Sequence, residues 1–563
     1  MLRTLFFLIF FISTLSFTSG AQEQTYRGTE FWAGYGHHQF MEPSNTNGQE
    51  LVFYLSTLQD PATVTITIDS SNTPWSRTYN IPANSVIVSD PIPKSGVSDA
   101  RLYGIPIVFG GNGGVGLFRK KGIHIESNVP IAVYSHIYGQ ASSGASLLLP
   151  VSSWGYSYQS MNSKQEYTSN CYSWAYVVAS KDSTLIEIKP SVLTLYQNYT
   201  GLQPGISKMI TLQKGQVYQV LGANQAADSN GNGGTGVLGF ELTGTSIRSL
   251  SIDKPIAVFS GSSRTRNSAS CGAGGGDNDM VQVFPLHMWG RKYLTAPLPS
   301  STSASYMSTS IYKIIVNDST TIVRKNGVIL TGLINSSYYI YESNQPDHIE
   351  ADKPIMVAQF MTGGSCTTGL GDPDMYYISP IDAGIKNVNC VRTVKESITI
   401  NYVTLIIPTA GINSLLIDGS STFNHSYVHP SLPGYTVVIK SWTAALTQFT
   451  IQSDSTFTGI TYGMGNVESY GYNLGANFNP SNGVDSLVPM VWTGAISTDW
   501  FNAGNWSTVH VPTEIDHVRI PGGTPFSPAI QNGRVAHCKS ISAEPNATVN
   551  VGSNAILNIV GKR

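Results

Sequence analysis

Two glycine-rich loops carry the residues best suited to chemistry. Asp277 and Asp279 lie two positions apart in one loop, and Asp372 and Asp374 have the same spacing in another. Carboxylates at this spacing can ligate Ca²⁺, which takes roughly six to eight hard oxygen ligands. Aspartates in such loops more often accept backbone hydrogen bonds in tight turns. We therefore expect turn-stabilising aspartates, with a calcium site at these four residues as the alternative.

The two loops are copies of one element. Residues 271–280 read CGAGGGDNDM and residues 366–375 read CTTGLGDPDM, so the cysteine, both aspartates and the methionine recur at the same intervals. A second element, Asp/Asn-x-Pro-Ile-x-Val, occurs at 128–133, 253–258 and 352–357. Its proline has a fixed φ and favours extended geometry in the preceding residue, so we expect a turn and then an apolar strand. Recurrence of both elements indicates tandem units.

Strand signals dominate the chain. Short β-branched runs such as 64–68 and 403–407 are bounded by Gly, Pro, Asn and Asp, and no amphipathic helix of ordinary length is evident. The sequence predicts an all-β fold in which about four related, β-sandwich-like units occupy 28–478. A propeller-like ring of these units is the alternative, because residues 31–35 and 459–463, near the two ends, both resemble the strands that follow the prolines.

The composition excludes one class of partner. Charged residues make up 12% of the 563 and the net charge is −2, so there is no electrostatic footprint for nucleic acid. Hydrophobic residues make up 41%, which is enough for packed cores.

The N-terminus predicts export. Arg3 precedes an apolar run at 5–12, and small residues end at Ala21, so residues 1–21 are expected to be a secretory signal peptide. No later run is long enough to cross a membrane as a helix, and the mature chain is expected to be secreted or held at the cell surface. We expect a linker at 479–488 and the Trp-rich start of a short β-solenoid-like module at 489–563.

The five cysteines are few and have no C-x-x-C spacing, so a zinc site is not indicated. In an exported protein we expect disulfides between Cys366 and Cys390 and between Cys171 and Cys271, which leaves Cys538 unpaired.

Several of these motifs together resemble the N-terminal domain family of the IgG Fc-binding protein, a secreted, mucus-associated protein with relatives among surface proteins of Bacteroidota-type bacteria. The matching residues are Gly28-Thr-Glu-Phe31-Trp32, the Asp/Asn-x-Pro-Ile-x-Val strands, and the run from Asp279-Met280 through Pro285 to Trp289-Gly290. The resemblance covers most of 28–478 and implies an extracellular binding protein.

No nucleophile elbow, zincin helix, P-loop or dinucleotide fingerprint occurs, so we expect no enzyme and no cofactor apart from the calcium alternative. The leading hypothesis is an adhesin-like protein that binds an extracellular glycoprotein, mucin or glycan. The alternatives are a structural surface spacer without a ligand and the non-catalytic part of a carbohydrate-active enzyme.

Overall fold

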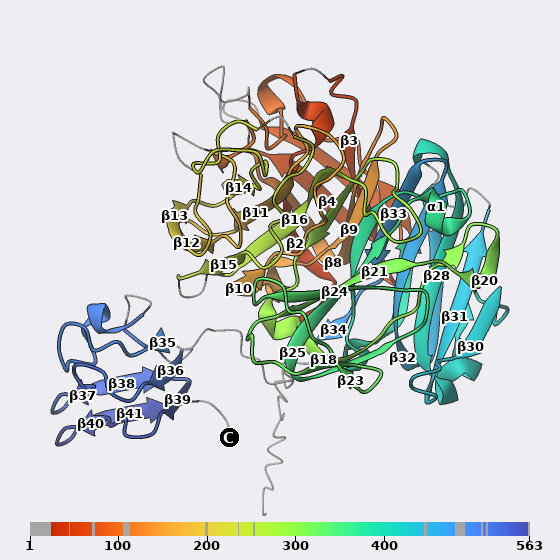
Figure 1. The fold of residues 1–563 in the computed structure, drawn as a ribbon. Helices are drawn as coiled ribbons and strands as arrows, with labels where there is room; N and C mark the ends of the chain where they lie inside the picture. The colour runs from red at the N-terminus through yellow and green to blue at the C-terminus, as the bar shows by residue number, and fades with distance from the viewer. Residues whose placement is uncertain are drawn as a thin grey trace, which may run out of the picture.

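The fold is almost entirely β-structure (Figure 1). The computed structural model describes residues 24–43, 45–69, 74–104, 113–196, 201–234, 236–251, 254–393, 395–443, 448–478, 490–507, 511–513 and 516–560. Within these ranges the α-helical structure is limited to α1 (Gly364–Thr367). The all-β prediction is confirmed. The predicted signal peptide at 1–21 and the predicted linker at 479–488 lie outside the described residues.

Long strands organise the sheets. The longest are β8 (Ile123–Tyr138), β25 (His348–Met361) and β32 (Gln448–Gly465). The first half of β8 pairs with β2 (Gly28–Ala33) and β4 (Ala62–Ile68), and its second half pairs with β3 (Glu50–Ser56) and β9 (Ser143–Leu148). Each long strand therefore belongs to two sets of partners.

Two of the prolines of the repeated element lie inside these long strands. Pro130 and Pro354 sit where β8 and β25 exchange partners, and the register with the neighbouring strand shifts at both places. Proline cannot donate to a strand ladder and is tolerated where the ladder is interrupted. We expected a turn at this element. At Pro130 and Pro354 the structure instead has a bulged bend within one long strand.

Four short hairpin strands meet at the centre of the molecule. Besides β9, they are β17 (Asp277–Gln282), β26 (Asp374–Ile378) and β33 (Glu468–Asn473), and each pairs with the strand before it in its own sheet. Strand β9 contacts β17 and β33, and β26 contacts the same two. All four are buried along their whole length. We call this arrangement the central four-strand bundle.

The bundle arranges the sheets in a closed ring. Strand β1 (Gln24–Thr25) pairs with β34 (Asn477–Phe478), which joins the two ends of this region. One continuous apolar core includes Phe53, Val258 and Phe360, which come from three different sheets. Other buried clusters belong to a single sheet, as does that of Tyr293, Ile314 and Val323 around β25. Sandwich-like packing within the units and a ring-like arrangement of the units are therefore both compatible with the structure. The number of sequence repeats remains a prediction.

Glycine permits the close approach of the central strands. A Cβ at Gly144 would lie 2.9 Å from the backbone oxygen of Asn278, and one at Gly471 would lie 2.7 Å from the Tyr376 ring. Both distances are too short for a side chain, so these two positions require glycine for packing.

The C-terminal residues form a small separate body of parallel strands (Figure 1). Strand β36 (His517–Ile520) pairs in parallel with β39 (Ser540–Ala543), and β38 (Val535–Cys538) pairs in parallel with β41 (Ile556–Ile559). Parallel pairing between successive turns of the chain is the arrangement expected of solenoid coils. Trp492, Trp500 and Trp506 are packed edge to face at the start of this body.

Candidate functional site

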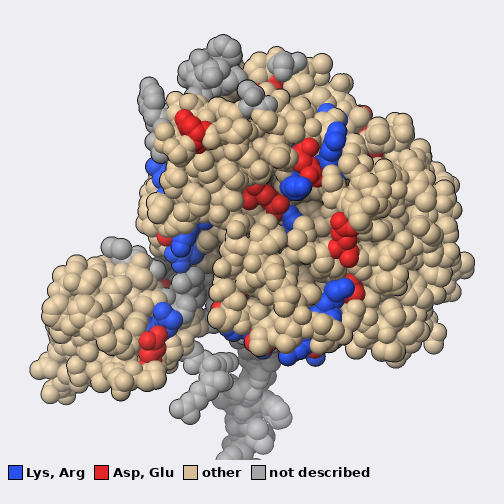
Figure 2. Space-filling model, in the orientation of Figure 1, with Lys and Arg blue, Asp and Glu red and all other residues tan. Residues whose placement is uncertain are grey.

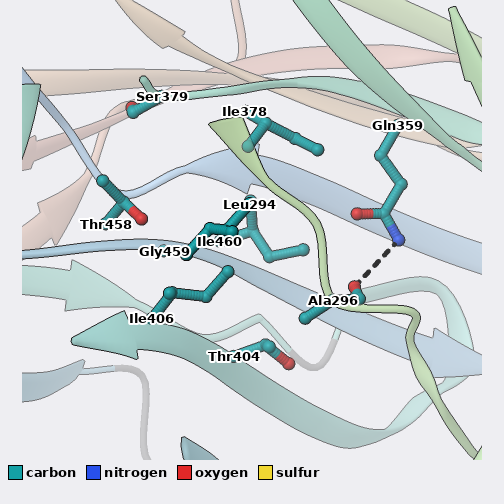
Figure 3. A pocket seen from close by; sticks show the side chains of 10 residues that line it. All are labelled: Leu294, Ala296, Gln359, Ile378, Ser379, Thr404, Ile406, Thr458, Gly459 and Ile460. Atoms are coloured by element: carbon teal, nitrogen blue, oxygen red, sulfur yellow. Dashed lines mark hydrogen bonds between the residues drawn. The ribbon is translucent and has the colours of Figure 1, made fainter. Parts of the chain in front are cut away.

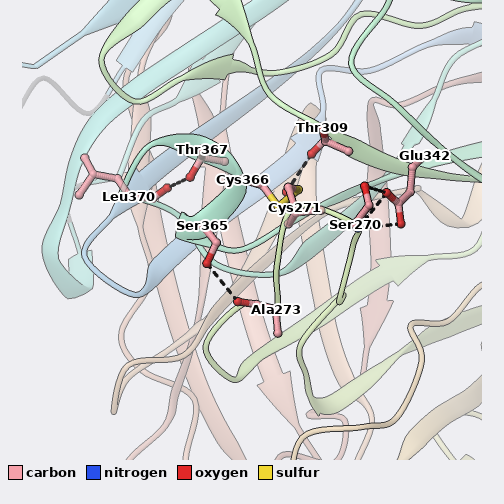
Figure 4. Close-up of a disulfide and its surroundings, with 10 residues drawn as sticks. Ser270, Cys271, Ala273, Thr309, Glu342, Ser365, Cys366, Thr367 and Leu370 are labelled. Carbon is pink, nitrogen blue, oxygen red and sulfur yellow. Dashed lines mark hydrogen bonds between the residues drawn. A yellow bond between two sulfur atoms is a disulfide. The ribbon is translucent and has the colours of Figure 1, made fainter.

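The disulfide joins the two copies of the glycine-rich loop (Figure 4). Cys271 is bonded to Cys366, with 5.3 Å between their Cα atoms. The predicted pairs Cys366–Cys390 and Cys171–Cys271 are therefore wrong, and Cys171, Cys390 and Cys538 are buried and unbonded. The reason lies in the ring: sequence-equivalent loops of neighbouring sheets lie against each other. A Cβ at Gly363 would lie only 2.0 Å from the Cα of Gly274.

The four predicted aspartates lie just before or within the first residues of the central strands β17 and β26. Asp374 accepts hydrogen bonds from the backbone N–H groups of Met375 (2.7 Å) and Gly471 (2.6 Å). Asp277 accepts from the backbone of Asn278 (2.8 Å) and of Ser143. The donors Gly471 and Ser143 belong to neighbouring sheets. We expected these aspartates to accept hydrogen bonds from backbone N–H groups within turns. Such hydrogen bonds are present, but they connect strands of different sheets.

Asp279 and Asp372 complete the set. Asp279 accepts a hydrogen bond from the Ser163 hydroxyl, and Asp372 faces the backbone of Gly275, where a Cβ would lie 2.7 Å from Oδ2. Glu468, which begins β33, adds a carboxyl that the sequence analysis did not single out. We call Asp277, Asp372, Asp374 and Glu468 the carboxyl cluster, because their charges influence one another.

Burial raises the pKa of every carboxyl in this cluster. The pKa is raised to about 7 for Asp372 and to about 9 for Glu468, where repulsion from Glu396 and Asp372 adds to burial. Asp277 and Asp374 are shifted in the same direction for the same main cause. Burial disfavours the charged form, so these groups retain protons near neutral pH.

No metal-ligand set is assembled by the described residues: no three His, Cys, Asp or Glu side chains there are placed to hold a metal ion. The calcium alternative therefore gains no support from this geometry and remains a prediction. The cation next to the cluster is Arg264, whose charge lowers the pKa of Asp372 and Glu468. Its Nε donates to the Gly276 carbonyl (2.6 Å), and its side chain lies over the rings of Phe40 and Tyr167.

The larger cavity lies between the strands that pair with β8 and the sheet that contains β17. It has a volume of about 540 Å³, and we call it the basic cleft. Its lining comes from β2, the end of β4, the turn after β7 (Gly116–Phe118), β8, and the turn between β13 (Lys208–Leu212) and β14 (Val217–Leu221). The lining residues are Trp32, Thr67, Asp69, Arg119, Lys120, Gly122, His124, Gln213, Lys214, Gly215 and Gln216.

A stacked aromatic pair forms one wall of the basic cleft. The rings of Trp32 and His124 lie 4.0 Å apart and nearly parallel. Both hydrogen-bond to the same oxygen of Glu30, at 3.1 Å from Trp32 Nε1 and 3.0 Å from His124 Nε2. The Lys214 ammonium lies 5.7 Å from the centre of the Trp32 ring. Because Glu30 holds both rings, the wall is fixed before any ligand arrives.

A second, smaller cavity is apolar (Figure 3). It is lined by Leu294, Ile406 and Ile460, with Gln359 at its rim donating to the Ala296 carbonyl at 3.3 Å. Its volume of about 20 Å³ has room for one water molecule and not for a sugar ring. Of these two cavities among the described residues, the basic cleft is the candidate binding site.

Sequence reasoning did not find the basic cleft. Arg119 and Lys120 follow β7 and Lys214 precedes β14, two paired strands that lie about 100 residues apart in sequence, and no local motif connects them. Of the residues in the cleft wall, Trp32 stood in a motif quoted above, the opening Gly28–Trp32 run. Its position beside Gly28 and Phe31 in a strand gave no sign of a cavity.

The fold and these sites define a class: a disulfide-linked, all-β scaffold whose sheets surround a buried central bundle and carry a surface cleft between them. The chain belongs to the IgGFc binding protein family, whose model matches residues 144–463. Residues 491–562 match a domain of unknown function, DUF8693. No curated protein matches the chain.

The family is one of binding proteins and is not known as catalytic, which agrees with the expected absence of enzymatic motifs. The disulfide is compatible with secretion. Within the described residues, no helix has the length and apolar character needed to span a membrane.

Proposed function

We propose that this protein is a non-enzymatic, adhesin-like binding protein, exported by its signal peptide and acting outside the cell or on its surface. Its partner is an extracellular glycoprotein, mucin or glycan, and its source is a Bacteroidota-type bacterium. The observation that carries the proposal is the family match over 144–463. This region includes the disulfide, β17, β26, nearly all of β9 and the turn at 213–216 that lines the basic cleft.

The construction of the ring supports a binding role. The sheets share a core, and the carboxyl cluster and the disulfide connect neighbouring sheets at the loops. A rigid scaffold lowers the entropy lost when its surface binds a partner. The surface has few charges, and Figure 2 shows Lys, Arg, Asp and Glu as scattered groups among other residues. A surface of this kind suits a polar partner such as a glycoprotein.

The test is a binding screen of the purified mature chain, residues 22–563, against immobilised mucins, a glycan array and IgG Fc. Each surface is measured with calcium and with a chelator. Saturable binding to at least one of them is the expected result. Absence of binding on every surface, from protein shown to be folded, would overturn the proposal and favour a structural spacer. Loss of binding in chelator would support the calcium alternative.

A further inference from the structure

The basic cleft combines features that recognise one class of ligand. We propose that it binds an acidic sugar residue, a pyranose that carries a carboxylate or a sulfate group. This inference rests on the proposed function and makes it more specific, because it names both the ligand chemistry and the place where it binds.

The charge of the cleft is the first argument. Arg119, Lys120 and Lys214 are exposed, and none of them forms an ion pair with another described residue. The neighbouring Lys121 differs, since its ammonium lies 3.7 Å from Asp99. Asp69 is the acidic residue in the lining, so cations outnumber carboxylates by three to one there. Lys214 lies near enough to Glu30 for its charge to lower the pKa of that carboxyl, whereas Arg119 and Lys120 have no charged partner among the described residues. Three cations around one cavity, in a chain with net charge −2, indicate an anionic ligand.

The second argument is the neutral part of the lining. Gln213, Gln216 and Thr67 supply amide and hydroxyl groups, which can both donate to and accept from sugar hydroxyls. Trp32 contributes a rigid apolar wall. One ring face is covered by His124 and Gly215 lies close to the ring, so the wall presents an edge and not an open stacking face. Polar groups beside an apolar wall fit a pyranose ring, which has hydroxyls and C–H groups side by side.

The third argument is size. Ligand pockets commonly measure about 300–1,000 Å³, and the cleft, at about 540 Å³, lies within that range. It accommodates one or two sugar rings, such as the end of a glycan chain. An extended polyanion would need a longer basic groove, and the remaining lining offers no further cations.

The glycine at the cleft edge fits the same interpretation. Gly215 has φ +73°, and a Cβ there would lie 3.0 Å from the Trp32 ring. Both the backbone conformation and the close contact favour glycine at this turn. The turn thereby brings Lys214 next to the aromatic wall, so an anionic group bound by Lys214 would lie against the ring edge.

The experiment is isothermal titration of the mature chain, residues 22–563, with sialyllactose, 6-sulfo-galactose and neutral lactose at low salt. We expect measurable binding of an acidic ligand and at least tenfold weaker binding of lactose. The two acidic ligands distinguish a carboxylate from a sulfate as the recognised group. Binding that weakens as salt rises from about 50 to 300 mM is expected for contacts between exposed charges.

Variants locate the ligand. The double variant Arg119→Gln with Lys214→Gln should lose at least tenfold in affinity, while Lys208→Gln, an exposed lysine on β13 outside the lining, should be unchanged. Equal binding of lactose and acidic sugars, or an unchanged double variant, would overturn the inference. Mucin binding by the wild-type chain separates the two proposals. If the wild-type chain binds mucin but binds neither sialyllactose nor 6-sulfo-galactose, the cleft inference is wrong and the proposed function stands; if the wild-type chain binds no surface at all, the proposed function fails as well.

Discussion

Cys271 and Cys366 hold the same position in two copies of one loop, and they are bonded to each other across 95 residues of sequence. The bond lies at the end of the central bundle where the carboxyl cluster begins. It therefore connects neighbouring sheets at the place where buried acidic groups repel each other.

Loss of this disulfide should destabilise the ring. For a loop of about 100 residues the chain-entropy estimate approaches 5 kcal/mol, and measured losses are typically about 2–4 kcal/mol. We expect Cys271→Ser with Cys366→Ser to lower the free energy of unfolding by that amount in guanidinium titrations. The double variant should be insensitive to dithiothreitol, whereas the wild type should be destabilised by it. Three thiols should react in the unfolded, unreduced protein, and a count of one would indicate a second bond.

Stability should fall as pH rises from 7 to 9. Glu468 has a pKa of about 9 in the folded protein, far above the value for an exposed glutamate, so the folded state holds a proton that the unfolded state has lost. Under that condition the free energy of unfolding decreases with pH up to the folded pKa. The loss is on the order of 2 kcal/mol for this one group. His38 and His136, whose pKa burial lowers to about 3, remain neutral throughout this range.

The variant Glu468→Gln should flatten this dependence. Denaturant titrations at pH 7 and pH 9 measure the slope, and Glu544→Gln, at a half-exposed carboxyl in the C-terminal body, should keep the wild-type slope. If Glu468→Gln has the same slope as the wild type, this carboxyl is not the source of the pH dependence of the free energy of unfolding.

Filling the space at Gly471 should disrupt the central bundle. Alanine there would place its Cβ 2.7 Å from the Tyr376 ring, and overpacking of this kind costs about 1–3 kcal/mol. The matched control is Gly434→Ala, because nothing lies within 4 Å of a Cβ at that position. Differential scanning fluorimetry should show a lower Tm for the first variant alone, and equal Tm values would contradict the packing described above.

The C-terminal body should depend on Asn505. This buried side chain accepts hydrogen bonds from the backbone N–H groups of Ile496 and Ser497 and donates to the Asp499 carbonyl. At about 1 kcal/mol for each bond, Asn505→Ala should cost about 2–4 kcal/mol. The loss of stability can be measured by tryptophan fluorescence during unfolding, because three tryptophans pack beside this turn. Asn558→Ala, at an exposed position, is the control and should leave the fluorescence transition unchanged.

The sequence predicted the class of fold well and the contacts between sheets poorly. β-branched runs between Gly, Pro and Asn indicate strands wherever they pack, so the all-β fold followed from local signals. The equivalence of Cys271 and Cys366 was visible, but their bond depends on ring closure, a property of the whole chain. Lys214 and Arg119 meet because β7 and β14 pair across a long sequence separation, and Glu468 joins the aspartates although its own loop shares no motif with theirs.

The pairing of β1 with β34 sets an order of assembly. Strand β9 has two neighbours in the central bundle, β17 and β33. Strand β17 is synthesised first, and β33 is made more than 300 residues after β9. The side of β9 that contacts β33, and strand β1, thus remain uncovered until the chain has been made as far as residue 478. The fold of this region is therefore complete only after residue 478 has been made, and until then the uncovered strands depend on protection from aggregation.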